Sequence, residues 1–141
     1  MTTPRLDDQL CFALYSASRA VTAAYRPLLA ELNLTYPQYL VLLVLWEEDR
    51  ASVGRLCQRL HLDSGTLSPL LKRLEAVGYV TRERSAEDER RVDVLLTPAG
   101  KRLQDKASCV PERLLAASEM SLEEILALRD AVVRLTDTLN Q

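Results

Sequence analysis

Cys11 and Tyr15 are the first residues of this chain whose types and spacing could do chemistry. They lie four positions apart in the segment CFALYSASR, so on a helix the thiol and the phenol share one face. An ionised thiolate is a nucleophile that reacts with peroxides, whereas a buried free cysteine acts as a small hydrophobic side chain. The spacing alone leaves both roles open, and packing is the commoner one.

The other cysteines and the single histidine do not indicate a metal site. Cys11, Cys57 and Cys109 are an odd number without metal-ligand spacing, which favours reduced cytosolic thiols over a disulfide framework. His61 cannot complete a zinc set with cysteines so far apart in sequence. Cys57 belongs to an apolar run at helical spacing, which predicts that its thiol packs in the core. We expect no metal and no cofactor.

The composition is typical of one globular domain. Of the 141 residues, 48% are hydrophobic and 27% are charged. No stretch approaches the roughly 20 apolar residues of a membrane span. The opening segment MTTPRLDDQL has no apolar signal-peptide core. We therefore expect a single domain over residues 1–141, located in the cytoplasm and without a membrane partner.

The charge is unevenly distributed along the chain. A formal net charge of −2 argues mildly against nucleic acid as a partner. Residues 52–106, however, contain eleven Lys and Arg against eight Asp and Glu, whereas the rest of the chain contains seven against twelve. A basic middle between acidic ends is the pattern expected of a protein that binds nucleic acid through its centre.

Helix caps and apolar periodicity divide the chain into elements. The first helix begins near Asp7 or Asp8, either of which can cap it, and runs to about Leu32. In LTYPQ, Thr35 and Gln38 form a capping box that opens a buried helix. Ser52 caps a short helix, and Asp63 or Ser64 caps a helix from about Ser64 to Val77, in which Pro69 causes a late start or a kink. Two strands follow within 79–84 and 91–97. A helix begins after Thr97-Pro98 and bends at Pro111, and a last helix begins at Ser121.

This order of elements is typical of a winged helix. A short helix, a tight turn and a second helix form a helix-turn-helix, and the two strands that follow form the wing. The sequence therefore predicts a mainly α fold with a small β-hairpin wing, whose DNA-binding core spans about 35–100. The segments 6–33 and 101–140 carry long apolar stripes, so we expect them to form a homodimer interface. Such a dimer binds double-stranded operator DNA as an inverted repeat.

The second helix of such a motif enters the major groove with its N-terminal residues at the base edges. Here that segment is SGTLSP, followed shortly by two basic residues. Hydroxyl groups can donate to phosphates or bases, glycine allows close approach, and the basic pair is expected on phosphates. Helix capping is the alternative role of Ser64 and Thr66. The candidate DNA-binding residues of this helix are Ser64, Gly65, Thr66, Ser68, Pro69, Lys72 and Arg73.

The predicted wing, ERSAEDERRV, is rich in arginine. Arginine suits a narrow minor groove, where the potential is most negative. We expect Arg90 to bind there, with Asp88 holding its guanidinium group by a bidentate pair. A solvated charged turn is the alternative, and the helix-turn-helix that precedes this segment favours the wing.

Several motifs resemble those of a known family. DERRVDVLLTPAG (88–100) is similar to the wing signature of the MarR family of winged-helix regulators, and LDSGTLSPLLKRLE (62–75) resembles its recognition helix. QLCFALYSASR and YRPLLAELNLTYPQYLVLLVLWE further resemble the organic hydroperoxide resistance regulators within that family. The resemblance covers nearly the whole chain. It implies a redox-sensing repressor that binds operator DNA when reduced and leaves it when an organic hydroperoxide oxidises Cys11.

The resemblance also assigns roles around Cys11. It implies that Tyr25 and Tyr36 donate hydrogen bonds to the sensing sulfur, with Tyr15 as a third candidate, while Tyr39 is expected in the core. Phenolic hydroxyls can stabilise a thiolate without adding a competing cation. The first turn of a helix favours negative charge for the same purpose. Together these features predict that Cys11 is a sensor.

Oxidation of Cys11 gives a sulfenic acid, which condenses with another thiol. Cys109 of the other subunit is the natural partner, although two-cysteine members of the family place this residue nearer to Leu115-Ala116-Ala117. Cys109 is therefore either a shifted resolving residue or a bystander, and a route through a small thiol stays open.

Phe12 and the apolar helix around Leu40 are expected to form a pocket that favours organic hydroperoxides over hydrogen peroxide. Two other functions compete with the sensor. One is a repressor of the same fold that a phenolic or drug-like ligand releases. The other is a thiol peroxidase, which would need neither a basic wing nor a recognition helix. We therefore expect a regulator and not an enzyme.

Overall fold

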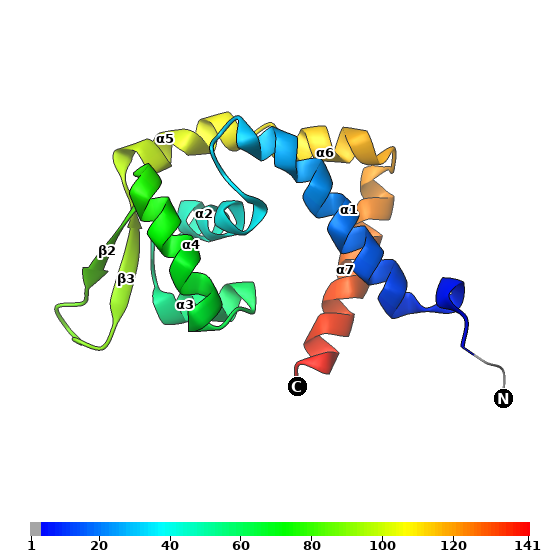
Figure 1. The fold of residues 1–141 in the computed structure, drawn as a ribbon, viewed down its shortest axis with the longest axis horizontal. Helices are drawn as coiled ribbons and strands as arrows, with labels where there is room; N and C mark the ends of the chain where they lie inside the picture. The colour runs from blue at the N-terminus through cyan, green and yellow to red at the C-terminus, as the bar shows by residue number, and fades with distance from the viewer. Residues whose placement is uncertain (1–3) are drawn as a thin grey trace. The chain divides into compact units, whose positions relative to one another are not determined.

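The computed structural model describes residues 4–141, which form two compact units (Figure 1). The first unit ends at Ala107, and the second is Ser108–Gln141. The elements of the first unit are η1 (Leu6–Asp8), α1 (Leu10–Ala30), α2 (Tyr36–Glu48), β1 (Arg50–Ser52), α3 (Val53–Leu60), α4 (Ser64–Val77), β2 (Val80–Arg84), β3 (Val92–Leu96) and α5 (Pro98–Ala107). None of the helices within 4–141 is long and apolar enough to cross a membrane.

Helix α1 begins slightly later than the sequence predicts. Asp7 and Asp8 do not cap it, because both lie in the short 3-10 helix η1. The N-cap is Gln9, whose backbone is extended and whose side chain does not cap the helix. Cys11 is nevertheless the second residue of α1, so the prediction that it lies in the first helical turn is confirmed.

The helix-turn-helix forms as its caps predict. The Gln38 side chain accepts a hydrogen bond from the Thr35 N–H at 3.0 Å, which completes the capping box of α2. Ser52 Oγ accepts from the Arg55 N–H at 3.0 Å and starts α3. Asp63, rather than Ser64, caps α4 by accepting from the Thr66 N–H at 2.7 Å. Each cap satisfies a backbone donor that the first helical turn cannot pair internally.

Helix α4 is continuous through Pro69, so the late start that we considered does not occur. Proline lacks the N–H that would bond to the Gly65 carbonyl, which costs one hydrogen bond in the second turn. Gly78 ends the helix in the left-handed conformation, with φ of 93°. A glycine is favoured there because it has no Cβ to clash.

The sheet contains three strands, one more than the sequence predicts. β3 pairs antiparallel with β2 on one side, with Val80 opposite Leu96, and with β1 on the other, with Ala51 opposite Val94. β1 was missed because a three-residue strand shows no alternation, and its last residue also caps α3. The β2–β3 hairpin extends away from the helices beside α4 (Figure 1).

The core of the first unit lies between α2, the helix-turn-helix and the sheet. Its fully buried side chains include Leu42, Leu45, Leu56, Leu67, Leu71, Leu74, Val80 and Val94. Cys57 was expected among them, but it is only half-buried. Leu56 takes the inward position of the short helix α3, which leaves its neighbour at the edge of the core.

Gly100 joins α5 to the rest of the unit. Its carbonyl accepts a hydrogen bond from Trp46 Nε1 at 2.9 Å, and its N–H donates to Thr97 Oγ1 at 3.1 Å. A Cβ atom at this position would collide with the backbone carbonyl of Tyr79. The close approach of two backbone segments therefore requires glycine here.

We expect Gly100→Ala to destabilise the protein by about 2–3 kcal/mol, because a backbone carbonyl cannot move aside as a flexible side chain can. Urea unfolding at a fixed protein concentration measures this change. Gly54→Ala is the matched control, because the nearest atom to its Cβ is Ser52 Oγ at 4.0 Å. Alanine favours a helix over glycine, so this control should be neutral or stabilising. Equal stability of the two variants would contradict the packing argument.

The second unit contains α6 (Val110–Ser118) and α7 (Leu122–Leu139). The bend expected at Pro111 is instead a break, because α5 ends at Ala107 and α6 starts at Val110. Pro111 stands in the first turn of α6, where its missing N–H costs nothing. The capping box of Ser121 and Glu124 that starts α7 is confirmed. Large apolar side chains of α7 are exposed, namely Leu122, Leu126, Leu128, Val133 and Leu139.

Candidate DNA-binding face and redox site

The first turns of α4 present the small and hydroxylated residues that the sequence singled out. Ser64, Gly65, Thr66 and Pro69 are exposed, and Ser68 is half-buried. Because Asp63 is the cap, neither Ser64 nor Thr66 fills that role. Hydrogen bonds from the backbone and side chain of Thr66 lower the pKa of Asp63, so this cap is ionised at neutral pH.

Lys72 and Arg73 follow two turns further along α4 and are exposed. Neither makes an ion pair within the described residues 4–141. Both cations are therefore available for a phosphate. Their role as phosphate contacts stays a prediction.

Three of the four arginines of the β2–β3 hairpin, which we call the wing arginines, are bound to other groups of the chain. Arg82 donates to the carboxylate of Glu75 on α4 at 2.9 Å, Arg84 to the carbonyl of Glu89 at 2.7 Å, and Arg91 to Asp93 at 2.8 Å. Arg90 is exposed, and within 4–141 its guanidinium group makes no ion pair or hydrogen bond. The structure thus distinguishes Arg90 from the other three.

The predicted contact between Asp88 and Arg90 is present in a different form. Asp88 Oδ1 accepts the backbone N–H of Arg90 at 3.0 Å, and it does not hold the guanidinium group. A carboxylate two residues before a backbone N–H commonly forms such an Asx turn. The bidentate pair was therefore wrong, and Asp88 shapes the backbone of the wing instead.

Asp93 anchors the base of the wing. Its carboxylate accepts from Arg91 at 2.8 Å and from Arg50 of β1 at 3.2 Å, and only 7% of its side chain is exposed. Hydrogen bonding to Arg91, supported by Arg50, lowers the pKa of Asp93. The stabilisation is therefore complete above the unfolded-state pKa and is lost as the pH falls through the lowered folded-state pKa. Sequence reasoning missed this residue, because its partner Arg50 lies on the unpredicted strand β1.

The start of α4 and the wing line a common groove of about 470 Å³. Ser64 lines it from α4, Asp88 and Arg90 line it from the wing, and the start of α3 contributes Val53 and Gly54. Cys57 of α3 also lines this groove, which is consistent with its half-buried state. The groove therefore joins one predicted DNA-binding residue of α4, Ser64, to Asp88 and Arg90 of the wing.

Cys11 is exposed on the first turn of α1. Tyr15, on the same helical face, is also exposed, and the guanidinium carbon of Arg19 lies 5.6 Å from the centre of its ring. Within residues 4–141, no three His, Cys, Asp or Glu side chains are grouped in a way that could hold a metal ion.

Tyr25, Tyr36 and Tyr39 form an aromatic cluster between α1 and α2. The ring centres of Tyr25 and Tyr36 lie 4.7 Å apart, and Tyr39 lies 5.9 Å from Tyr25. Burial, with the neighbouring phenols Tyr36 and Tyr39 adding to it, raises the pKa of Tyr25 to about 12. Burial also raises the pKa of Tyr36 and of Tyr39. All three phenols are therefore protonated at neutral pH and can donate.

The tyrosine cluster is not near Cys11 in the same chain. Cys11 and Tyr25 lie on one helix, 14 positions apart, which corresponds to about 21 Å along its axis at 1.5 Å per residue. Pro27, the residue that could kink α1, comes after Tyr25. The structure thus brings Tyr25 and Tyr36 together, as the resemblance implied, but within one chain it separates Tyr25 from the thiol.

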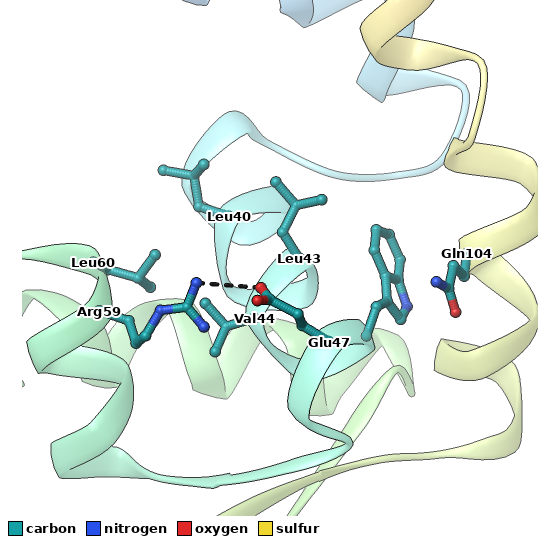
Figure 2. A pocket seen from close by; sticks show the side chains of 8 residues that line it. Leu40, Leu43, Val44, Glu47, Arg59, Leu60 and Gln104 are labelled. Carbon is teal, nitrogen blue, oxygen red and sulfur yellow. Dashed lines mark hydrogen bonds and ion pairs between the residues drawn. The ribbon is translucent and has the colours of Figure 1, made fainter. Parts of the chain in front are cut away.

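An apolar pocket of about 520 Å³ opens beside α2, with α3 and α5 completing its lining (Figure 2). Leu40 and Leu43 line it, and the salt bridge between Arg59 and Glu47, 3.2 Å long, closes one side. Leu40 lines an apolar pocket as expected, but its predicted companion Phe12 does not line this pocket and is 40% exposed on α1. The pocket could hold the organic part of a small molecule.

Comparison with known proteins gives consistent results. A family model described as "Transcriptional regulator SarA/Rot" matches residues 23–107. The organic hydroperoxide resistance transcriptional regulator of Bacillus subtilis (strain 168) is 49% identical over 137 residues, covering 97% of this chain and 93% of that protein. Two similar solved structures are of AbfR, a protein of Staphylococcus epidermidis. Reduced AbfR bound to DNA is 35% identical, with a TM-score of 0.81 and coverage of 97% and 96%. Disulfide-formed AbfR is 38% identical, with a TM-score of 0.64 and coverage of 96% and 90%.

Proposed function

This chain belongs to the MarR family of winged-helix transcriptional regulators, and within it to the organic hydroperoxide resistance regulators, so we propose that it is a redox-sensing repressor. Its reduced form binds operator DNA, and oxidation of Cys11 by an organic hydroperoxide releases that DNA. The family is one of regulators and not of enzymes. We also propose that the protein acts in the cytoplasm, where operator DNA lies.

The observation that carries this proposal is an exposed thiol at Cys11, in a chain that aligns almost end to end with a hydroperoxide resistance regulator. The Cys11 thiolate attacks the terminal oxygen of the hydroperoxide, and an S–O bond forms as the O–O bond breaks. The sulfur is oxidised to a sulfenic acid, and the peroxide is reduced to an alkoxide, which takes up a proton to become an alcohol. The apolar pocket beside α2 favours a peroxide that carries an organic group over hydrogen peroxide.

The proposed DNA-binding face comprises the start of α4 and the wing, which reach one groove through Ser64 and Arg90. In this proposal the start of α4 enters the major groove, while Lys72 and Arg73 bind phosphates. Arg90, whose guanidinium group makes no ion pair or hydrogen bond within 4–141, enters the adjacent minor groove. Operator binding measured with and without cumene hydroperoxide tests the whole proposal.

We propose a homodimer that binds an inverted repeat, because the sensing site cannot be completed within one chain. The distance of about 21 Å along α1 means that Cys11 can meet Tyr25 only if that tyrosine comes from the partner subunit. The exposed apolar side chains of α1 and α7 supply the surface for such an interface. Sedimentation at micromolar concentration should give twice the 15.9 kDa of one chain. A folded monomer would contradict this assembly.

Replacing Tyr36 with phenylalanine should slow the oxidation of Cys11. The change removes one hydrogen bond to the thiolate and keeps the ring, and such a bond to a charged group contributes about 1.5–3 kcal/mol. The smaller thiolate population is partly offset by its greater nucleophilicity, so we expect the rate constant to fall about five- to fiftyfold. Stopped-flow measurement with cumene hydroperoxide gives this rate.

Tyr39→Phe is the matched control for that measurement. Tyr39 belongs to the same aromatic cluster, but it is 3% exposed, and the family resemblance assigns it no hydrogen bond to the Cys11 thiolate. Its replacement should leave the rate within about twofold. Equal slowing in both variants would point to a packing effect and remove Tyr36 from the sensing site.

A further inference from the structure

The wing tip is a closely hydrogen-bonded loop between β2 and β3. Ser85 N–H donates to the Arg91 carbonyl at 2.8 Å and closes its base, and Arg91 N–H donates to the Asp88 carbonyl at 2.9 Å. Inside the loop, Glu87 N–H donates to Ser85 Oγ at 3.2 Å. The loop that carries Arg90 therefore has a defined shape before any DNA arrives.

One peptide group in this loop is held by side chains at both ends. It joins Glu89 to Arg90, so it contains the Glu89 carbonyl and the Arg90 N–H. The carbonyl accepts a hydrogen bond from Arg84 Nη1 at 2.7 Å, and the N–H donates to Asp88 Oδ1 at 3.0 Å. A peptide group is planar, so fixing both of its polar ends fixes the plane from which the Arg90 side chain departs.

We propose that Arg84 is a positioning residue, which fixes the peptide before Arg90 so that the Arg90 side chain points at DNA. This inference rests on the proposed function, in which Arg90 contacts DNA. Arg84 is the last residue of β2, and its guanidinium group spans the loop to reach the Glu89 carbonyl. It acts by removing conformations of the wing tip that DNA binding would otherwise have to order.

This role differs from that of a direct phosphate contact, which is the obvious use of an exposed arginine on a wing. A direct contact adds its own binding energy whatever residue stands at position 90. A positioning residue acts only through Arg90, so its effect disappears when Arg90 is removed. The two roles therefore differ in whether the effects of the Arg84 and Arg90 variants on operator affinity add, and in how that affinity depends on salt.

A double-mutant cycle with Arg84→Met and Arg90→Ala tests the proposal, with operator affinity measured by fluorescence anisotropy at several salt concentrations. Arg84→Met should weaken binding about three- to tenfold when Arg90 is present, and less than about twofold in the Arg90→Ala protein. In that background the slope of log affinity against log salt should not change. A direct contact would lower the slope by about 0.9 and give additive effects, and either result would overturn the proposal.

Two further variants complete the test. Arg102→Met removes one exposed positive charge from α5, away from the wing, and should change the affinity by less than about twofold.

Asp88→Ala releases the other end of the same peptide group. Removing a negative charge should strengthen DNA binding by electrostatics alone, whereas loss of positioning weakens it, so tighter binding would count against the proposal. If Arg90→Ala itself has no effect, the wing contact of the proposed function fails; if only the coupling is absent, Arg84 alone loses its role.

Discussion

A Cys11→Ser protein should bind operator DNA as tightly as the wild type and should stay bound at concentrations of cumene hydroperoxide that release the wild type completely. A serine hydroxyl is not ionised near neutral pH and does not form a sulfenic acid, so the oxidation step is lost. Cys11 is exposed, so its replacement leaves no cavity in the core. Anisotropy of labelled operator DNA gives both affinities. Release of the variant by hydroperoxide would remove Cys11 from the sensing role.

The other two cysteines provide the controls. Cys57→Ser should be released like the wild type, although Cys57 lines the groove beside Arg90. Cys109 is exposed at the N-cap of α6, and its replacement separates the two routes after the sulfenic acid forms. If Cys109 resolves the oxidised sulfur, Cys109→Ser should accumulate sulfenic acid or pass to higher oxides. If a small thiol resolves it, Cys109→Ser should form the same mixed disulfide as the wild type.

The competing functions predict different results for the same proteins. A repressor released by a phenolic ligand would respond to that ligand equally in the wild type and in Cys11→Ser. A thiol peroxidase would reduce an alkyl hydroperoxide repeatedly with a dithiol reductant, and Cys11→Ser would abolish that turnover. The proposed repressor consumes one equivalent of peroxide for each oxidised Cys11.

Arg90→Ala should weaken operator binding by several-fold to hundreds-fold at fixed salt. Among the wing arginines, Arg82, Arg84 and Arg91 are occupied within the chain, so Arg90 is the one left to bind DNA. A well-placed contact of this kind contributes about 1–3 kcal/mol, and the narrow minor groove of A·T-rich DNA strengthens it. Competition between operators with A·T and G·C flanking sequences shows whether the loss is confined to the A·T operator.

Lys72→Ala is the comparison for that prediction. Lys72 is exposed on α4 and we propose that it contacts a phosphate, so its loss should weaken binding to all sequences equally. It should also lower the salt slope by about one. If Arg90→Ala left the affinity unchanged, the contact between the wing and the minor groove would be ruled out.

The helix-turn-helix could be predicted from sequence because each of its boundaries is marked by a residue with one physical role. Thr35, Ser52 and Asp63 cap three successive helices, and Gly78 ends the last of them. β1 could not be predicted, because its three residues are defined by pairing with β3 and not by any local pattern. Cys57 was misplaced for a related reason, since a short helix with one buried leucine leaves the depth of its neighbour to tertiary packing.

The residue types of the candidate site could be predicted from the sequence, whereas several of the contacts between those residues could not. Asp88 stands two residues before Arg90, which suits either a backbone or a guanidinium hydrogen bond, and only the loop geometry decides between them. The separation of Cys11 from Tyr25, in contrast, follows from helix geometry alone. It could have been read from the sequence as evidence that the sensing site needs two copies of the chain.

The most direct test of the account follows Cys11 oxidation and DNA release in the same sample. Wild-type protein on labelled operator DNA is titrated with cumene hydroperoxide, anisotropy reports the bound fraction, and peptide mass spectrometry reports the oxidation state of each cysteine. We predict that the fraction of operator DNA released rises in step with the oxidised fraction of Cys11, whatever the oxidation state of Cys57. Release while Cys11 is still reduced, or full oxidation of Cys11 with the DNA still bound, would contradict it.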